Sequence, residues 1–416
     1  ALPVIEIPEF HFHKVAPLFS NLPEAKQTVD IQPMEQFNQG WGTILYRTTL
    51  PETTLAGTTL KITEVHDWAQ IYADGKLLAR LDRRKGEFAT TLPALKKGTQ
   101  LDILVEAMGR VNFDKSIHDR KGITEKVELI SGNQTKELKN WTVYNFPVDY
   151  SFIKDKKYSD TKILPTMPAY YKSTFTLDKV GDTFLDMSTW GKGMVWVNGH
   201  AMGRFWEIGP QQTLFMPGCW LKEGENEILV LDLKGPTRAS IKGLKKPILD
   251  VLREKAPETH RKDGEKLKLT GEKVAHEGAF TPGNGWQEVR FATPVKGRYF
   301  CLEALSPQAN DNIAAIAEFD VLGADGKPVS REHWKIRYAD SEETRSGNRT
   351  ADKIFDLQES TFWMTVDNVL YPHQLVIDLS KVENVTGFRY LPRAEKGYPG
   401  MIKEYRVYVK PADFNY

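Results

Sequence analysis

A repeated β-hairpin pattern limits what this chain can fold into more than any other feature of its sequence. Residues 71–80 (IYADGKLLAR) align position by position with residues 195–204 (VWVNGHAMGR). In each copy an apolar strand reaches Asp-Gly or Asn-Gly, and a second strand ends in a small residue followed by arginine. Because these dipeptides accept the positive φ angles of a type I′ turn, each copy predicts a tight hairpin.

The match extends to both sides of the hairpins. Upstream, residues 46–50 (YRTTL) pair with residues 171–175 (YKSTF), and downstream a proline turn, a glycine turn and a further strand follow in both copies. Short alternating apolar segments bounded by turn residues are typical of β-strands. We therefore expect an all-β chain that contains two copies of one jelly-roll sandwich, at residues 37–142 and 143–236.

Length and charge narrow the function classes. A chain of 416 residues is long enough for two to four domains. The net charge of +1 does not favour nucleic-acid binding, and no apolar run approaches the ~20 residues that span a bilayer. Cys219 and Cys301 lie in different expected domains, so we expect no structural disulfide. The first residues lack a signal-peptide pattern, and we expect the chain to begin inside a longer polypeptide or after processing.

Five strings in the first half carry a family resemblance. They are residues 15–19 (VAPLF), 39–47 (QGWGTILYR), 109–113 (GRVNF), 192–200 (KGMVWVNGH) and 203–214 (GRFWEIGPQQTL). These strings resemble the glycoside hydrolase family 35 β-galactosidases. In that family such segments follow the catalytic (β/α)₈ barrel and form accessory sandwiches of galactose-binding-like fold.

The resemblance implies an accessory function. Residues 1–36 would connect the barrel to the sandwiches and could supply a strand to the second sandwich. The chain would be the C-terminal region of an enzyme that removes terminal β-D-galactose residues. It would brace the catalytic barrel of the same polypeptide, shape the active-site rim and bind β-galactoside-containing glycans.

The chemistry of a retaining glycosidase is missing from the sequence. Such an enzyme needs two carboxyl groups about 5 Å apart, and the family carries its acid/base in a Glu-Asn-Glu-Tyr motif. Residues 225–228 (ENEI) resemble that motif, but they follow a turn signature and lead into an alternating strand. No alternation of strands and helices predicts a barrel. We therefore expect no catalytic residue in this chain.

One loop is expected to lie near the active site. The resemblance implies that residues 109–113 approach the barrel mouth, which makes Asn112 and Phe113 candidate rim residues. Many relatives carry tyrosine at the position of Phe113, so a hydroxyl is lost while an aromatic surface remains. The alternative is a plain packing role for this loop. Arg80 and Arg204, which end the repeated hairpins, are expected to be structural.

The last third of the chain resembles a different domain. Residues 286–323 resemble the closing half of a discoidin, or factor 5/8 type C, domain, and residues 356–408 resemble its opening half. The order is reversed, so we expect residues 262–416 to form one circularly permuted sandwich. Halves of two damaged domains are the alternative. Residues 237–261 are expected to be a linker, with a short helix at residues 247–255.

Two kinds of site are expected in this last module. Relatives hold a structural Ca²⁺ through oxygen ligands, and the matching residues are Asp356, Thr361 and Glu318, for which solvated carboxylates are the alternative. No organic cofactor is expected. Relatives also bind glycans by stacking aromatic rings on the sugar and bonding its hydroxyls. The matching residues are Trp363, Tyr371, His373, Arg393 and Tyr398, although Trp363 also fits a core position.

Three functions remain open from the sequence. The first is the accessory region of a β-galactosidase, the second is a free-standing carbohydrate-binding protein, and the third is a purely structural adhesion-like array. The substrate class alone leads us to expect a periplasmic or secreted protein. His11 and His13 alternate on one strand face without further metal ligands nearby, so we expect them to be surface residues.

Overall fold

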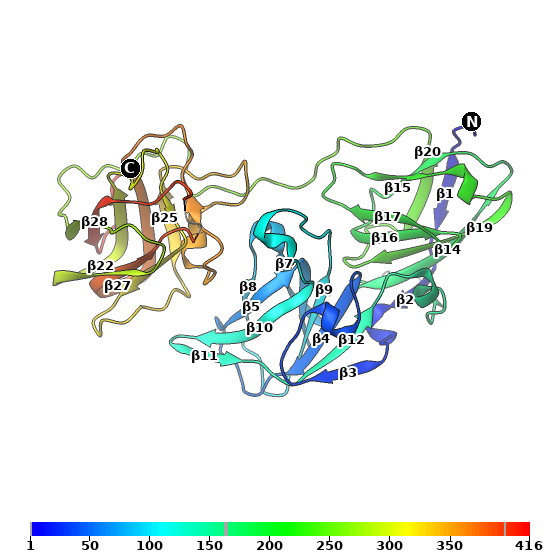
Figure 1. Cartoon of the computed structure of the whole chain (residues 1–416), viewed down its shortest axis with the longest axis horizontal. Helices are drawn as coiled ribbons and strands as arrows, with labels where there is room; N and C mark the ends of the chain where they lie inside the picture. Colours follow the sequence, from blue (N-terminus) through cyan, green and yellow to red (C-terminus); the bar gives the residue numbers. More distant parts are fainter. Residues whose placement is uncertain (1, 162–164, 395–396) are drawn as a thin grey trace. The chain divides into compact units, whose positions relative to one another are not determined.

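The computed structural model of the chain describes residues 2–161, 165–394 and 397–416, and β-strands dominate it (Figure 1). Within the described residues the only α-helix, α1, is one turn long (Tyr150–Ile153). Two compact units can be distinguished: residues 1–26, 41–44 and 143–255, and residues 27–40, 45–142 and 256–416. The second unit contains the first sandwich and the discoidin-like module, and each of these has its own sheets.

The first sandwich contains a six-stranded and a four-stranded sheet. The six-stranded sheet has the order β3 (Ala25–Thr28), β12 (Trp141–Phe146), β4 (Thr43–Thr49), β9 (Gln100–Glu106), β6 (Trp68–Ala73) and β7 (Lys76–Asp82). The four-stranded sheet has the order β11 (Gln134–Glu137), β10 (Gly122–Ser131), β5 (Thr59–His66) and β8 (Ala89–Thr91). Three 3₁₀ turns accompany them: η2 (Met34–Phe37), η3 (Arg83–Lys85) and η4 (Asp114–Ile117).

The second sandwich repeats this plan. Its six-stranded sheet has the order β13 (Ser159–Asp160), β2 (Lys14–Pro17), β14 (Ala169–Leu177), β19 (Gly224–Asp232), β16 (Lys192–Val197) and β17 (His200–Trp206). The four-stranded sheet has the order β1 (Ile7–His11), β20 (Ser240–Leu244), β15 (Thr183–Asp186) and β18 (Thr213–Met216). Two 3₁₀ turns, η1 (Leu18–Ser20) and η5 (Gly218–Trp220), belong to it.

The predicted hairpins occupy equivalent places in the two sandwiches. The order β4-β9-β6-β7 in one sheet corresponds to β14-β19-β16-β17 in the other. In both hairpins the turn residues have positive φ, 45° and 78° for Asp74 and Gly75, and 47° and 82° for Asn198 and Gly199. These values are those of a type I′ turn, so the tandem all-β fold is confirmed.

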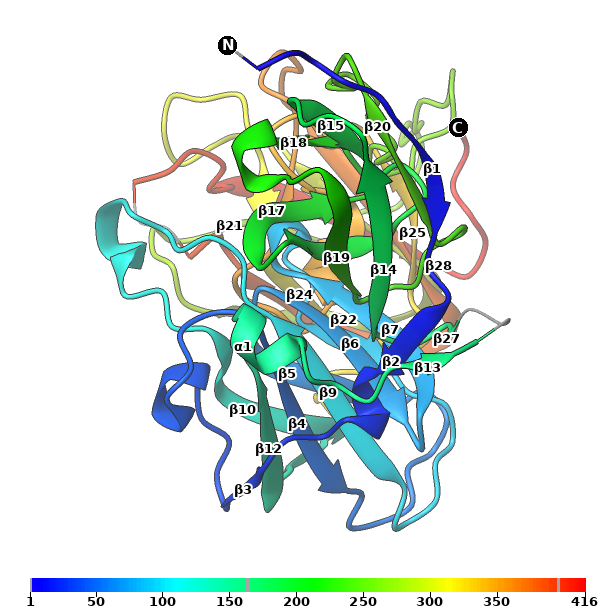
Figure 2. The same ribbon diagram turned by 90° about the vertical axis from the view of Figure 1, so that its right-hand side faces the viewer.

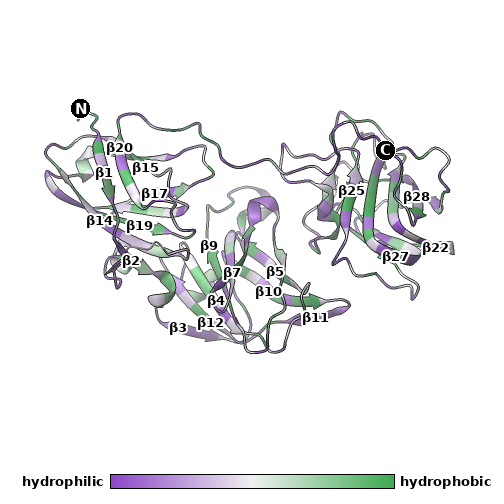
Figure 3. Cartoon of the chain, turned by 180° about the vertical axis from the view of Figure 1, so that it is seen from behind, coloured by the Kyte–Doolittle hydropathy of each residue, from purple (hydrophilic) through white to green (hydrophobic). Residues whose placement is uncertain are grey.

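The second core is built around Trp190. Its ring meets those of Phe12 and Tyr171 edge-on, with both centroids 5.1 Å away. Its indole N–H donates to the Ser240 carbonyl over 3.0 Å, so its buried polar atom is satisfied. Most residues of the buried core lie in the strands, where Figure 3 shows the hydrophobic residues concentrated.

The first 36 residues supply strands to both sandwiches. β1 pairs with β20 and β2 pairs with β14, so both complete the second sandwich, as Figure 2 shows. β3 joins the first sandwich beside β12, which continues to Phe146 and so crosses the boundary expected at residue 142. Likewise β20 lies within residues 237–261, which were expected to be a linker.

The prediction of a short helix at residues 247–255 is wrong. These residues are extended, and their backbone pairs with residues 208–212. The Val251 amide donates to the Pro210 carbonyl over 3.0 Å, and the Arg253 amide donates to the Ile208 carbonyl over 2.8 Å. A helix of two turns is marginal by itself, so these longer-range backbone hydrogen bonds prevail.

The discoidin-like module is a sandwich with one shared core. Its main sheet has the order β21 (His276–Ala279), β28 (Glu404–Lys410), β22 (Gln287–Ala304), β27 (His373–Leu391) and β24 (Glu318–Leu322), and β25 (Lys335–Ala339) also pairs with β27. A small sheet pairs β23 (Ala315–Ile316) with β26 (Trp363–Met364), and η6 spans Ala351–Phe355.

Both halves of this module contribute to that core. The rings of Phe300 and Phe319, from the first half, lie 5.7 Å and 5.3 Å from the ring of Phe388 in the second. The two halves therefore do not form separate half sandwiches. Lys268 and Asn415 form a backbone bridge, so the beginning and the end of the module lie together.

Candidate functional site

The loop between β9 and β10 presents an apolar tip to solvent. The side chains of Val111, Phe113 and Ile117 are 38%, 78% and 56% exposed. Asn112 is exposed as well, and Asp114 turns the chain with a φ of 56°. Exposed large hydrophobic residues that are close together in the sequence often mark a contact surface. We refer to residues 108–117 as the tip loop.

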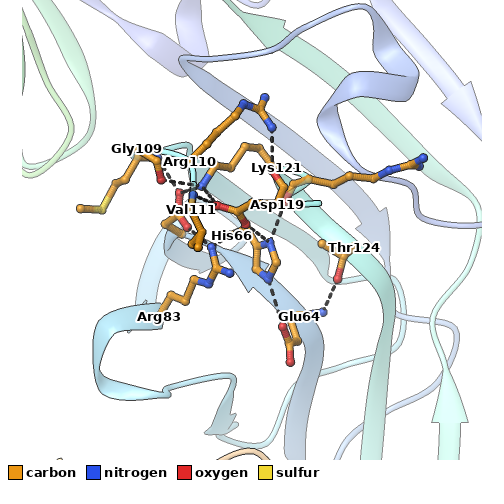
Figure 4. Close-up of polar contacts among 12 residues, drawn as sticks. Glu64, His66, Arg83, Gly109, Arg110, Val111, Asp119, Lys121 and Thr124 are labelled. Carbon is orange, nitrogen blue, oxygen red and sulfur yellow. Dashed lines mark hydrogen bonds and ion pairs between the residues drawn. The ribbon is translucent and has the colours of Figure 1, made fainter. Parts of the chain in front are cut away.

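A buried lysine lies beneath the tip loop. The side chain of Lys121 has no exposed surface, and its ammonium lies 2.7 Å from Asp67 Oδ2 and 2.8 Å from Asp119 Oδ2. It also donates to the Gly109 carbonyl over 3.0 Å, as Figure 4 shows. These three bonds use all three ammonium donors, which is what a buried charge requires.

Arg83 is a second cation that contacts the same two carboxylates. Its guanidinium lies 2.7 Å from Asp67 Oδ1 and 2.8 Å from Asp119 Oδ1. Burial alone would raise the pKa of Asp119, but hydrogen bonds from Lys121, the Val111 amide and Arg83 outweigh it and lower this pKa to about 2. Asp119 therefore stays ionised at every physiological pH.

The same carboxylates hold the backbone of the tip loop. The Met108 amide donates to Asp67 Oδ2 over 2.6 Å, and the Val111 amide donates to Asp119 Oδ2 over 3.0 Å. Arg110 donates to the carbonyls of Asp119 and Gly40, each over 2.6 Å. Residues 108–111 are thus fixed by charge-assisted hydrogen bonds, which are stronger than neutral ones.

His66 extends this network to the four-stranded sheet. Its Nδ1 lies 2.6 Å from the Arg120 carbonyl and its Nε2 lies 3.0 Å from Glu64 Oε2 (Figure 4). The hydrogen bond to His66 lowers the pKa of Glu64 although burial opposes this change. The cluster of Asp67, Arg83, Asp119 and Lys121 was not found from the sequence, because its members come from three separate segments.

The glutamate-containing string at residues 225–228 is structural. Asn226 is buried, and its side chain bonds backbone groups of Lys222 and Gly224. Glu227 accepts a hydrogen bond from the Tyr150 hydroxyl over 2.7 Å, which raises the pKa of Tyr150 to about 12. The side chains of Asn226 and Glu227 are thus both bonded to neighbouring parts of the chain.

Three of the five expected sugar-binding residues have their polar groups bonded inside the module. The expectation is wrong for Trp363 and His373, whose side chains are buried, whereas the side chain of Tyr371 is half-buried. Trp363 is 1% exposed and donates through its indole N–H to the Ser341 carbonyl. His373 is fully buried between Asp340 and Asn312. Tyr371 packs against the core, and its hydroxyl donates to the Ile313 carbonyl over 2.7 Å. None of these polar groups points to solvent.

The other two residues lie at the surface together with a tryptophan that was not predicted. Tyr398 is 53% exposed, and the Arg393 guanidinium lies 4.6 Å from its ring centroid. Trp286, 36% exposed, lies under the guanidinium of Arg389 at 4.4 Å. Buried Asp320 fixes Arg389 by accepting from its Nε over 2.9 Å. A tryptophan directly after a Pro-Gly-Asn-Gly turn was the sequence signal that could have revealed this position.

The three expected metal ligands are brought together. The Thr361 hydroxyl donates to Asp356 Oδ2 over 2.7 Å. The backbone N–H of Gln358 donates to both Asp356 Oδ1 and Glu318 Oε1. Burial and the neighbouring Glu318 raise the pKa of Asp356 well above its usual range. Two buried carboxyls this close need a proton or a cation between them, and Arg331, which bonds Glu318 and Asp320, supplies one positive charge.

These residues fit a calcium ion in their chemistry, since carboxylate and hydroxyl oxygens are the ligands that it prefers. Their number falls short of a full shell. Among the described residues no group of three or more His, Cys, Asp or Glu side chains could hold a metal ion. Backbone carbonyls and water would have to complete the coordination.

Replacing Asp119 tests the anchoring of the tip loop. Asp119→Asn removes a charge from buried Lys121 and half-buried Arg83, so we expect a loss of about 3–5 kcal/mol in the free energy of unfolding at neutral pH. The folded pKa of about 2 lies below the usual value, so this contribution is present above about pH 4 and is lost as the pH falls toward about 2. Denaturant unfolding of both proteins across this range measures the difference.

The matched control is Asp114→Asn, an exposed aspartate of the same loop whose positive φ asparagine also accepts. We expect it to change stability by less than about 0.5 kcal/mol. Equal effects of the two substitutions would contradict the anchoring role of Asp119.

Three family descriptions match separate parts of the chain. They are "Beta-galactosidase, first all-beta domain" over residues 32–147, "Beta-galactosidase, galactose-binding domain" over residues 168–226, and "F5/8 type C domain" over residues 338–416. Within the described residues, no helix is long and apolar enough to cross a membrane.

Curated relatives match only with part of their length. Beta-galactosidase-1-like protein 2 of Homo sapiens is 35% identical over 205 residues, which make up 48% of this chain and 30% of that protein. Beta-galactosidase 1 of Dictyostelium discoideum is 31% identical over 246 residues, or 53% of this chain and 35% of that protein. An apo lectin of Pleurotus ostreatus aligns with 58% of this chain and 82% of its own, at 12% identity and a TM-score of 0.18, too low to support an argument.

The matched regions agree with the observed sheets. The first two descriptions fall on the tandem sandwiches and the third falls on the last module. The chain therefore contains regions that match the first all-β domain and the galactose-binding domain of β-galactosidases, followed by a region that matches an F5/8 type C domain.

Proposed function

We propose that this chain is the accessory region of a β-galactosidase and that its tip loop lies at the rim of the active site. The observation that supports this most is an exposed apolar tip whose backbone is held by buried ion pairs. The chain spans about a third of the length of relatives named as β-galactosidases, which leaves room for a catalytic part outside it.

A rigid loop suits this function for a physical reason. A contact loop that is already ordered loses little conformational entropy when it meets a partner or a substrate. Phe113 offers a flat aromatic surface for the aglycone side of a galactoside, and Asn112 offers an amide. The buried cluster would keep both residues in place, and the sandwiches would brace the catalytic barrel. With glycans as substrates, we further propose that the protein acts outside the cytoplasm.

Activity measurements test this proposal. We expect the chain alone not to hydrolyse a chromogenic β-galactoside and the full polypeptide that carries it to do so. In that polypeptide, Phe113→Ala should lower kcat/KM for a β-galactosyl disaccharide about fivefold, since stacking contributes roughly 1 kcal/mol.

Val29→Ala is the control, because Val29 is equally apolar and 60% exposed but lies outside the tip loop. It should leave kcat/KM unchanged. Hydrolysis by the chain alone, or a Phe113→Ala enzyme with full activity on the disaccharide, would count against the proposal.

A second candidate function is glycan binding by the last module. Trp286 and Tyr398 expose aromatic rings that arginines hold in place, and the Asn284 side chain donates to the Ala394 carbonyl, so their two loops are in contact. Exposed rings beside hydrogen-bonding side chains are the elements of a sugar site. A free-standing carbohydrate-binding protein would use the same surface, whereas a purely structural array would not bind sugar.

Calorimetric titration with lactose tests this candidate. We expect Trp286→Ala to weaken binding about tenfold, which corresponds to about 1.4 kcal/mol. Trp41→Ala, at a 44% exposed tryptophan outside this module, should not change the affinity. If the Trp286→Ala protein bound lactose with the same affinity as the wild type, the sugar site would lie elsewhere. If the wild type did not bind lactose, the purely structural array would be favoured.

We also propose that Asp356, Glu318 and Thr361 hold a structural Ca²⁺. An ion between the two carboxylates would remove the repulsion that raises the pKa of Asp356. The ion would supply structural charge and no reaction step. Arg331 would remain as a second positive charge bound to Glu318.

Thermal unfolding tests the calcium proposal. Adding Ca²⁺ to chelator-treated protein at about a hundredfold excess over Kd should stabilise the module by about 2.7 kcal/mol. Asp356→Asn should abolish this response, whereas Asp352→Asn, at an exposed neighbour in η6, should keep it. An unchanged Tm of the wild type with Ca²⁺ would refute the site.

A further inference from the structure

One short segment of the last module is bonded to many others. Asp340, Ser341 and Glu342 follow β25, and we refer to them as the 340–342 segment. The Ser341 carbonyl accepts a hydrogen bond from the Trp363 indole N–H. Asp340 Oδ1 accepts from the backbone N–H of Gln374 over 2.9 Å. Glu342 Oε1 accepts from the backbone N–H of Ala351 over 2.7 Å. The side chain of Glu342 is 1% exposed, so its charge is buried.

Two histidines bond the two carboxylates of this segment. The first is His373, which is fully buried. Its Nδ1 lies 2.8 Å from Asp340 Oδ2, and its Nε2 lies 2.6 Å from the Asn312 carbonyl. Both neighbours are acceptors.

The second histidine is His260, which lies where the chain enters the module. Its backbone N–H donates to Glu342 Oε2 over 2.5 Å, and its Nδ1 lies 2.7 Å from Glu342 Oε1. The adjacent Arg261 donates to the Asp340 carbonyl over 2.8 Å. The segment of residues 258–261 is thereby attached to the 340–342 segment through one carboxylate and one carbonyl.

The charges around His260 favour its protonated form on balance. His260 faces Glu342 and Asp352, and Lys353 opposes its charge. Burial lowers the pKa of His260, but the hydrogen bond and charge of Glu342 outweigh burial and raise it. His373 faces Asp340 and the ring of Tyr371, and Asp311 lies beside Tyr371. The nearby cation is Arg261, which donates to the Asp340 carbonyl.

The sign of the pH dependence follows from this arrangement. A histidine whose folded pKa is raised contributes stability that is fully present below its unfolded pKa, near 6.5. That stability is lost as the pH rises through the folded value. The contact between His260 and Glu342 therefore weakens as the pH rises.

We propose that His260 and Glu342 form a pH-sensitive latch, closed at acidic pH, that ties residues 258–261 to the 340–342 segment. At alkaline pH the latch opens, and residues 258–261 become a freer part of the connection that leads into the module. This proposal does not depend on the β-galactosidase assignment, because its contacts join only the last module and the residues that lead into it.

Hydrogen exchange on the full chain tests the latch. The readout is the protection factor of residues 258–261, corrected for the intrinsic exchange rate, at about pH 5.5 and about pH 8.5. We expect protection in the wild type to fall by roughly three- to tenfold at the higher pH. Protection of β28 is the internal reference and should stay constant, which separates latch opening from unfolding of the module.

Two variants show whether the contact between His260 and Glu342 causes the pH dependence of this protection. His260→Gln and Glu342→Gln should both give protection of residues 258–261 that no longer depends on pH. They leave the fully buried His373 untouched, so the module should fold. His333→Gln, at a histidine with a 77% exposed side chain in the same module, should behave as the wild type.

Two outcomes would overturn the proposal. One is equal protection of residues 258–261 in the wild type at both pH values. The other is a pH-dependent fall that persists in full in both His260→Gln and Glu342→Gln.

Discussion

A charge that is removed from water must find partners, and this requirement explains most of the polar architecture of the chain. Lys121 is the clearest case, since two carboxylates and a carbonyl use all its donors. Asp232 meets the same requirement in the second sandwich, where the amides of Gly191, Lys234 and Gly235 donate to it. In the last module Arg331 bonds the buried carboxylate of Asp320, and buried His373 bonds the half-buried carboxylate of Asp340. Removing one member of such a group leaves the others buried and unpaired, so each group fixes the local backbone.

These groups lie beneath loops, and that placement connects fold to function. β-sandwiches carry their variable segments at the ends of strands, and a loop without support would be mobile. In the first sandwich the cluster of Asp67, Arg83, Asp119 and Lys121 holds the tip loop. In the last module Asp320 holds Arg389, which in turn stacks on Trp286. Buried carboxylates thus fix two different contact surfaces.

The sequence was informative where the structure depends on neighbouring residues. Asp-Gly and Asn-Gly determine a turn by their own backbone preferences, so the two hairpins and the tandem sandwiches could be predicted. It was less informative where partners come from afar. Trp363, Tyr371 and His373 have the right chemistry for a sugar site, but Ser341, Ile313 and Asp340 use their polar atoms. Lys121 and Asp67 are 54 positions apart, and no local pattern indicates that they meet.

The bridge between Lys268 and Asn415 has a consequence for how such a module can be rearranged. Because the module begins and ends at neighbouring points, a short peptide could close this gap and the chain could be reopened at another surface turn, such as the one at Gly326, which has a positive φ. The core formed by Phe300, Phe319 and Phe388 would be kept, since it depends on which strands are adjacent and not on their order along the chain. A module of this kind can be inserted into a loop of another protein as readily as it can be joined to an end.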